Sequence, residues 1–362
     1  MSTGSLGRRA VITALLLMLP LLALTLAADL LDVRVFERIV TLLFINLILV
    51  LGLQAFMGNS GILSFAHMGF MGIGAYTSAV LTIPVQMKGM ALPDLYPLLA
   101  SAEFSPYLGM LAGALVAAAV AALLSYPLMR LSDAAAVITS FALLVVLHTV
   151  MVHWSSVTNG PRTLFGIPRA TDLYLALLAA CAMVAVAVWF KESRTGLLLR
   201  AVRDDETAAA AMGANVSVLR WRGFILSAFM AGLGGALWGH FITSFSPNAF
   251  YLKETFVVLG MLVIGGPFTV SGAVLGTLAV TAAFESLRLA ENAINIAQVL
   301  PVRVVGLTEI VLAIAMIAVL IVRPGGMVRM AEVADLPLIR RLWAAQSRGG
   351  ETDGAGSVNP SR

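Results

Sequence analysis

The sequence predicts an all-α integral membrane protein, a polytopic helical bundle of about ten membrane segments in which some helices are broken or only half length. Two observations predict this class. Hydrophobic residues make up 60% of the 362 residues and charged residues only 12%, whereas roughly a quarter of a soluble domain is charged. The hydrophobic residues also form long runs, most of them near the roughly 20 residues that cross a bilayer.

Ten apolar segments follow one another along the chain. They are residues 10–28, 39–56, 61–83, 107–124, 134–153, 173–190, 223–245, 255–266, 268–289 and 304–322. Arg8 and Arg9 precede the first run, which is longer than the apolar core of a signal peptide, so we expect a retained span. Segment 255–266 is too short for a full span. It is either a half helix or begins earlier, within residues 250–254.

The distribution of basic residues predicts the topology. If the N-terminus is cytoplasmic, 15 of the 23 Lys and Arg residues fall in cytoplasmic segments, as the positive-inside rule requires. This assigns residues 1–9 to a cytoplasmic N-terminus, 10–322 to the membrane domain and 323–362 to a cytoplasmic tail whose end is disordered. Both termini are then cytoplasmic. Residues 39–83 and 255–289 share a span, a glycine-centred break and a second span, which suggests a repeat.

The densest group of charges is residues 191–222, which carry six basic and four acidic side chains between two apolar runs. Such a stretch cannot lie in hydrocarbon and must protrude, here into the cytoplasm. Ser193 can cap a helix and Gly213 can end it, with the charged side chains from Arg200 to Glu206 on the exposed surface. A solvated connector is the plain interpretation. However, a capped helix that presents paired charges beside small alanine residues favours a docking element.

Several function classes are disfavoured by the residues themselves. None of the three lysines follows a glycine, so the sequence has no P-loop, and ATP with its Mg²⁺ is expected on a partner. The single cysteine, Cys181, cannot form an intrachain disulfide. The four histidines show no metal-ligand spacing, and the basic residues lie in loops beside spans, which does not favour nucleic-acid binding. We therefore expect no enzyme activity, cofactor or metal in this chain.

Residues 191–222 resemble the cytoplasmic signature of ABC importer permeases, specifically the branched-chain amino-acid (LivM-type) family. The pattern S-x-x-G-x-x-L-x-A-x-R-x-x-E-x-A-A-x-x-x-G of that family is matched from Ser193 to Gly213. Further similarity lies in the glycine-rich stretch from Gly58 to Thr77, in Val263-Ile264-Gly265-Gly266, and in Arg323-Pro324-Gly325-Gly326. Together these motifs cover most of residues 40–326 in the family's order.

The resemblance implies a permease that is coupled to a separate ATPase. The coupling residues expected from it are Gly196, Arg200, Ala201, Arg203, Asp204, Asp205, Glu206, Ala208, Ala209 and Gly213. The residues expected along the translocation path are Ser64, His67, Gly69, Phe70 and Gly74. The implied partners are a second homologous permease, two ATP-binding cassette ATPases, an extracytoplasmic solute-binding protein and membrane lipid. The implied location is a bacterial-type cytoplasmic (inner) membrane.

The cargo stays open at this point. Branched-chain amino acids are the first expectation, and urea or short amides are the nearest alternative, because similar permeases carry them. A self-contained channel or secondary transporter is the alternative from another class. It would need no ATPase at residues 191–222 and would more often place a chain of ionisable side chains inside the spans.

Overall fold

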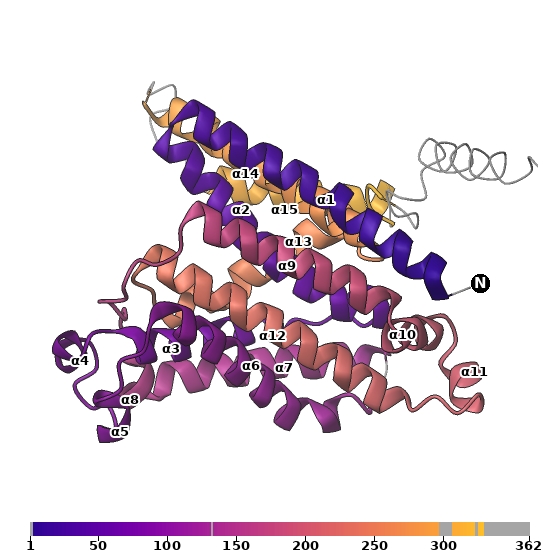
Figure 1. The fold of residues 1–362 in the computed structure, drawn as a ribbon, viewed down its shortest axis with the longest axis horizontal. Helices are drawn as coiled ribbons and strands as arrows, with labels where there is room; N and C mark the ends of the chain where they lie inside the picture. The colour runs from indigo at the N-terminus through magenta and orange to yellow at the C-terminus, as the bar shows by residue number, and fades with distance from the viewer. Residues whose placement is uncertain (1–2, 132, 297–305, 323–324, 329–362) are drawn as a thin grey trace, which may run out of the picture.

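The computed structural model describes residues 3–131, 133–296, 306–322 and 325–328 (Figure 1). Over these residues the fold is helical, with one isolated β-bridge between Leu164 and Phe245 and no strand. The long helices are α1 (Thr3–Leu31), α2 (Arg34–Leu53), α3 (His67–Thr82), α6 (Pro106–Leu128), α7 (Asp133–His153), α9 (Leu173–Glu192), α12 (Val216–Ile242), α13 (Leu252–Gly265), α14 (Val270–Ile296) and α15 (Leu307–Val322). The short ones are η1 (Gln54–Gly58), α4 (Val85–Ala91), α5 (Pro97–Ala100), α8 (Ser155–Thr158), α10 (Arg194–Asp204), α11 (Glu206–Ala211) and η2 (Pro247–Phe250).

The predicted fold class, a polytopic helical membrane protein, is confirmed. Among the described residues, eight stretches are long and apolar enough to cross a membrane, so the expected number of ten was approximate. The two expected segments that are not among the eight are α3 and α15, which are too short, with 16 residues each. The first two residues of the expected segment 304–322 lie outside the described residues.

The third expected span, residues 61–83, was wrong at its start. The helix begins only at His67, and residues 61–65 are non-helical. Two local features explain the delay. Gly61 has a φ of +75°, which a right-handed helix cannot include. The Ser60 hydroxyl also accepts the amide proton of Ile62 at 3.2 Å, which is a local alternative to a helical bond. Buried non-helical backbone of this kind is tolerated in a membrane only inside protein.

Of the two alternatives for segment 255–266, a half helix or a longer segment with an earlier start, the structure shows the earlier start. Helix α13 begins at Leu252 and follows the 3₁₀ turn η2, so the apolar stretch runs over Pro247–Gly265. It ends at Gly266, whose φ is +119°. The short stretch Gly325–Val328 returns to this end, where the amides of Met327 and Val328 donate to Ile264 O and Gly265 O. The rest of the expected tail, 329–362, lies outside the described residues.

Helix α12 is the centre of the bundle and packs against α2, α3 and α6. Glycine makes the α3–α12 contact possible. A Cβ on Gly74 would lie 2.1 Å from Gly232 O, and one on Gly235 would lie 2.0 Å from Met71 O. Only residues without a side chain let two helix backbones approach this closely. Close packing therefore accounts for Gly74 of the glycine-rich stretch and for Gly235 of α12.

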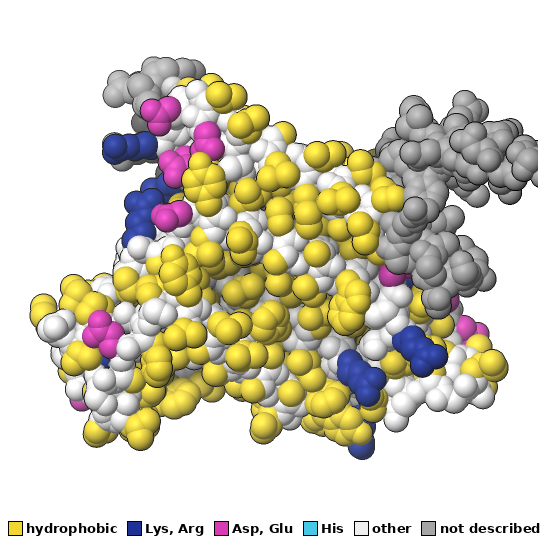
Figure 2. Space-filling model, viewed as in Figure 1, with side chains coloured by type: hydrophobic (Ala, Val, Ile, Leu, Met, Phe, Trp, Pro, Cys, Tyr) yellow, Lys and Arg dark blue, Asp and Glu magenta, His cyan; other side chains and the backbone are white. Residues whose placement is uncertain are grey.

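The surface divides into an apolar middle and two charged ends. Hydrophobic side chains cover most of the face seen in Figure 2, and Lys, Arg, Asp and Glu side chains lie near its two sides. Helices α10 and α11 lie at one end of the bundle, and α4, α5 and α8 lie at the other (Figure 1). We call the first the coupling end and the second the far end.

Candidate coupling site

Helix α10 begins as the sequence predicted. The amide of Gly196 donates to the Ser193 hydroxyl at 3.2 Å, which satisfies one free donor of the first turn. Gly196 is also required by space, because a Cβ there would lie 2.2 Å from Phe190 O at the end of α9. The cap and the glycine together let the chain turn sharply from the membrane helix α9 into the protruding helix α10.

The single helix expected from Ser193 to Gly213 is in fact two helices. Asp205 has extended backbone angles, φ −155° and ψ 105°, and its carboxylate accepts the amide proton of Ala208 at 2.9 Å. It thus ends α10 and caps α11. Aspartate competes for backbone donors in this way and is favoured at helix starts. Gly213 follows α11 with a φ of +86°.

Arg203 was expected on the exposed surface, and this was wrong. Its side chain is 19% exposed. Its Nη1 donates to Gly58 O at 2.8 Å, and its guanidinium carbon lies 4.9 Å from the centre of the Phe268 ring. Gly58 ends η1 and Phe268 lies in the connection between α13 and α14, so Arg203 joins α10 to both breaks of the suggested repeat. A planar guanidinium can make the hydrogen bond and the ring contact together.

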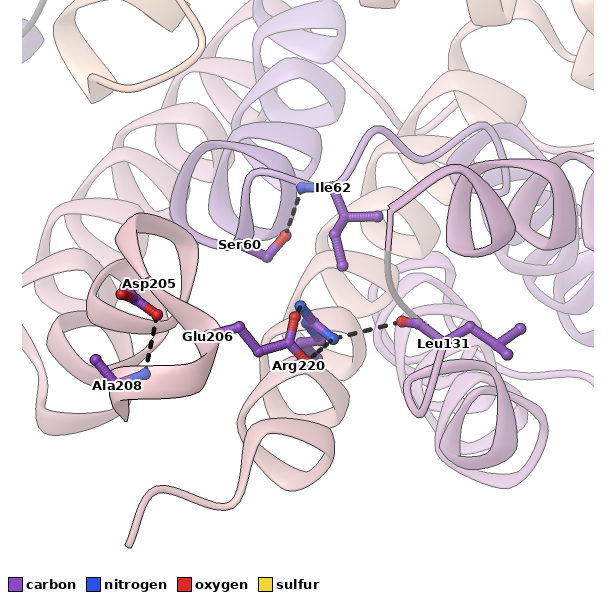
Figure 3. A network of polar contacts seen from close by, with 7 residues as sticks. All are labelled: Ser60, Ile62, Leu131, Asp205, Glu206, Ala208 and Arg220. Atoms are coloured by element: carbon purple, nitrogen blue, oxygen red, sulfur yellow. Dashed lines mark hydrogen bonds and ion pairs between the residues drawn. The ribbon is translucent and has the colours of Figure 1, made fainter. Parts of the chain in front are cut away.

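A second arginine joins α11 to the bundle. Arg220, whose side chain is 5% exposed, forms a 2.7 Å ion pair with Glu206 through Nη2, and its Nη1 donates to Leu131 O at 3.4 Å. Figure 3 shows Arg220 between Glu206 and Leu131. Arg220 was not among the residues predicted from the sequence. Its position at the polar start of a long apolar helix was the available signal, since a buried arginine there needs a partner.

The remaining predicted coupling residues lie mainly on the outside. Ala201, Asp204, Asp205, Glu206, Ala208 and Gly213 are exposed, Ala209 is half-buried and Gly196 is buried. Arg200 was also expected on the exposed surface and this was wrong, since its side chain is 20% exposed and pairs with Glu192. Large apolar side chains lie beside them, with Leu197 42%, Leu198 45% and Met212 89% exposed. We define the coupling face as Leu197, Leu198, Ala201, Ala208 and Met212. It combines small and apolar residues with nearby charges, a composition suited to a close protein contact.

The five residues predicted along the translocation path all lie in the packed interior. The His67 ring is hydrogen-bonded through Nε2 to the Ser227 hydroxyl, which itself donates to Gly52 O. Phe70 is fully buried and makes an edge-to-face contact with Phe224. A Cβ on Gly69 would meet the side chain of Leu147, and Gly74 is at the α3–α12 crossing described above. Ser64 is 3% exposed.

The Ser64 hydroxyl is the exception to this packed arrangement. It has no hydrogen-bond partner among the described residues, and the same holds for His67 Nδ1, whereas His67 Nε2 bonds to Ser227. It lines a small apolar space between η1, α7 and α12, of about 10 Å³. The described structure thus gives His67, Gly69, Phe70 and Gly74 a packing role. Their role in translocation stays a prediction.

Several polar residues in the membrane helices form hydrogen bonds between helices. Besides His67 with Ser227, the Ser78 hydroxyl and His240 Nε2 are 2.8 Å apart, and the amide of Phe65 donates to Ser140 Oγ at 3.2 Å. Gln54 is buried with neither amide atom bonded among the described residues. The same residues contain no group of three or more His, Cys, Asp or Glu side chains that could hold a metal ion.

Comparison with known proteins agrees with the family resemblance seen in the sequence. Over 307 residues the chain is 25% identical to the high-affinity branched-chain amino acid transport system permease protein LivM of Escherichia coli (strain K12), which covers 75% of this chain and 68% of that protein. The similarity to LivM of Salmonella typhimurium, also 25%, covers 69% of this chain and 63% of that protein. The chain thus spans about two thirds of the length of these relatives.

A second group of relatives is similar over a shorter stretch. The nucleoside ABC transporter permease protein NupC of Lactococcus lactis subsp. cremoris is 32% identical over 98 residues, 26% of this chain and 31% of that protein. No solved structure matches. Residues 35–320, most of the chain, match the family model described as "Branched-chain amino acid transport system / permease component". The chain therefore belongs to the family of branched-chain amino acid transport system permease components.

Proposed function

We propose that this chain is the membrane permease subunit of an ABC importer that moves branched-chain amino acids inward, using ATP hydrolysed by partner subunits. Family membership and the LivM relatives support the transport class and the cargo. The observation that carries the coupling mechanism is Arg203, which belongs to the protruding segment yet contacts both breaks in the membrane helices.

The coupling face is the proposed docking surface for an ATP-binding cassette subunit. Its apolar residues are exposed although they belong to a folded, capped segment. Two arginines attach this segment to the bundle, Arg203 on α10 and Arg220 through Glu206 on α11. A partner that pushes α10 and α11 therefore moves the α2–α3 and α13–α14 breaks together. A change of this kind is a shift between two packed states, driven by ATP binding to the partner.

The expected assembly contains a second homologous permease, two ATPases and an extracytoplasmic solute-binding protein. In this assembly ATP and Mg²⁺ belong to the ATPases, which fits the absence of a P-loop from the sequence. The coupling end faces the cytoplasm of a bacterial-type inner membrane, as the positive-inside count favours. Both termini lie on that side in this orientation.

Nucleosides are the second candidate cargo. Two relatives that match about a quarter of this chain carry the names nucleoside ABC transporter permease and guanosine ABC transporter permease. Urea and short amides, the alternative from the sequence, have no such relative among those reported above. The channel or secondary-transporter alternative would leave the coupling face without a partner.

Purification of the tagged chain from its native membrane in mild detergent tests the function class. We expect two P-loop ATPases and a second permease to be recovered with it. A chain that is recovered alone and conducts solute in liposomes without ATP would contradict the importer. Uptake of labelled leucine and of labelled guanosine by the reconstituted complex then decides between the two cargoes.

A further inference from the structure

A cavity of about 500 Å³ with a charged lining lies at the far end of the bundle, where the starts of α2 and α9 meet the end of α12. On the face shown in Figure 2, side chains of both charge signs gather beside the turn from α1 to α2. The charged lining residues are Arg34, Glu37 and Arg38 on α2, Arg169 in the connection before α9, and Asp172, which precedes α9. We call this space the arginine cavity. It lies outside the coupling face and contains none of the residues predicted along the translocation path.

The backbone around the arginine cavity is held in place by hydrogen bonds. The Thr171 hydroxyl donates to Leu237 O at 2.8 Å, and His240 Nδ1 donates to Pro168 O at 2.8 Å. These two bonds fasten the connection that carries Arg169 to the last turns of α12. Helix α2 packs against both α9 and α12. The arginines of α2 and of the connection therefore stand on backbones that are fixed relative to each other, as a binding site requires.

The three arginines of this cavity differ from those of the coupling end. Arg200, Arg203 and Arg220 each pair with a carboxylate. Within the part of the chain that the structure describes, the side chains of the three cavity arginines form no ion pair and no hydrogen bond. The Asp172 carboxylate likewise does not cap α9. A guanidinium presents its donors in a planar fork that matches the oxygens of a phosphate or carboxylate. These donors are therefore available to an anionic ligand.

The charged lining residues lie at the depth of the lipid headgroups. Arg38 directly precedes the expected apolar segment 39–56, and Asp172 directly precedes segment 173–190. In the proposed orientation this is the extracytoplasmic surface. Only eight of the 23 Lys and Arg residues fall on that side, and three of them line this cavity. The positive-inside rule leaves few basic residues on this side of a membrane, so topology does not account for the group.

Exposed apolar side chains adjoin the cavity. Val35 on α2 is 63% exposed, and Tyr174 and Leu178 on α9 are 63% and 67% exposed. The Tyr174 hydroxyl donates to Asp29 Oδ2 at 2.9 Å, so this ring has one polar and one apolar end, as is typical of residues at the membrane surface. Acyl chains that continue from the cavity find an apolar surface beside it. A lipid uses both surfaces, whereas a free anion uses only the first.

We propose that the arginine cavity binds the headgroup of a membrane phospholipid that carries both a phosphodiester and a primary ammonium group, as phosphatidylethanolamine does. The arginines donate to the phosphate oxygens, and Glu37 and Asp172 accept hydrogen bonds from the ammonium group. A headgroup with a phosphate alone would leave these two carboxylates beside a like charge. The cavity volume of about 500 Å³ is that of a site for a small molecule rather than for a single ion.

The test is native mass spectrometry of the purified complex in mild detergent, titrated with lipids that share the same acyl chains. We expect phosphatidylethanolamine to bind at least about tenfold more tightly than phosphatidylglycerol, which has no ammonium group, or phosphatidylcholine, whose ammonium has no proton to donate. The double variant Arg38→Gln with Arg169→Gln should lose at least about tenfold in this affinity. Arg162→Gln is the matched control, because Arg162 is exposed in the same connection and does not line the cavity.

A second variant tests the carboxylates and does not depend on the arginines. Glu37→Gln with Asp172→Asn should remove the preference for phosphatidylethanolamine over phosphatidylglycerol while phosphatidylglycerol still binds. A preference that persists in this variant would overturn the assignment of the two carboxylates. Equal loss of phosphatidylethanolamine binding in the Arg162→Gln control, or no loss in the arginine double variant, would overturn the cavity as the lipid site.

Glycerophosphoethanolamine, the same headgroup without acyl chains, distinguishes a lipid from a soluble ligand. We expect it to displace bound phosphatidylethanolamine only at a concentration at least about tenfold higher than the lipid itself, because it leaves the apolar surface uncovered. Displacement at an equal concentration would overturn the lipid as the ligand. These measurements need neither ATP nor cargo, so their outcome is independent of the proposed transport function.

Discussion

The two ends of the bundle differ in how tightly the helices close on each other. At the coupling end, Gly58 lies against Pro267 so closely that a Cβ would be 2.2 Å from its carbonyl oxygen, and Arg203 bridges the same two breaks. At the far half, α2, α13 and α14 separate around a cavity of about 220 Å³. The same helices thus contact tightly at one end and enclose space at the other.

This difference identifies the two helix breaks beside the coupling segment as the tightly packed part of these helices. Close backbone contacts have few intermediate positions, so such an end changes by switching between two packings rather than by gradual bending. Arg203 lies where the switch must occur, since it contacts η1 and the α13–α14 connection.

Gly58→Ala should disrupt the closed end most strongly. The new Cβ would meet the Pro267 backbone at 2.2 Å, and overpacking of this kind costs about 1–3 kcal/mol. We expect a lower thermal midpoint of the purified complex and loss of most uptake, measured by melting in detergent and by transport. Gly89→Ala is the control, because nothing lies within 4 Å of a Cβ there. Equal stability of both variants would contradict the tight contact.

Met212→Asp should release the ATPase without unfolding the permease. Met212 is 89% exposed beside α11, so the substitution removes no packing inside the chain, but it places a charge in the proposed interface. We expect at least about a tenfold loss of ATPase recovery on the tagged chain. Arg194→Ala, an exposed change at the start of α10, should retain recovery. Unchanged recovery with Met212→Asp would remove this residue from the docking surface.

Glu206→Ala should have a smaller effect, on the attachment of α11. It removes the ion-pair partner of Arg220, whose side chain is 5% exposed, while Glu206 itself is 44% exposed. We expect a stability loss of about 1–2 kcal/mol and reduced coupling of ATP hydrolysis to uptake. Glu206→Gln keeps a hydrogen-bond acceptor and should lose less. A larger loss with Gln than with Ala would exclude the ion pair as the cause.

Much of the fold followed from the sequence, since long apolar runs in a membrane have one main structural solution. The start of the protruding segment was also predictable, because Ser193 and Gly196 act locally. What could not be predicted depends on distant partners. Arg203 is charged, so the sequence places it on the surface. Its partners Gly58 and Phe268 are distant in the sequence and meet it only in the folded chain. The arginine cavity likewise exists only once α2, α9 and α12 meet.

The division of the expected helix at Asp205 was not predicted, for a different reason. Its signal was local, an aspartate three residues before Ala208 whose amide it accepts. The expected helix was extended across it because the alanines that follow favour helix so strongly. A cap inside a run of good helix formers is decided by backbone geometry rather than by composition.

The most direct test of the account is to compare uptake with ATP hydrolysis in the assembled importer carrying Arg203→Ala, beside Arg194→Ala as the control. We expect the Arg203→Ala complex to assemble and hydrolyse ATP but to lose at least about tenfold in uptake per ATP, since the link to Gly58 and Phe268 is gone. The control should match the unmodified complex. Uptake per ATP that is unchanged in Arg203→Ala would contradict coupling through this residue.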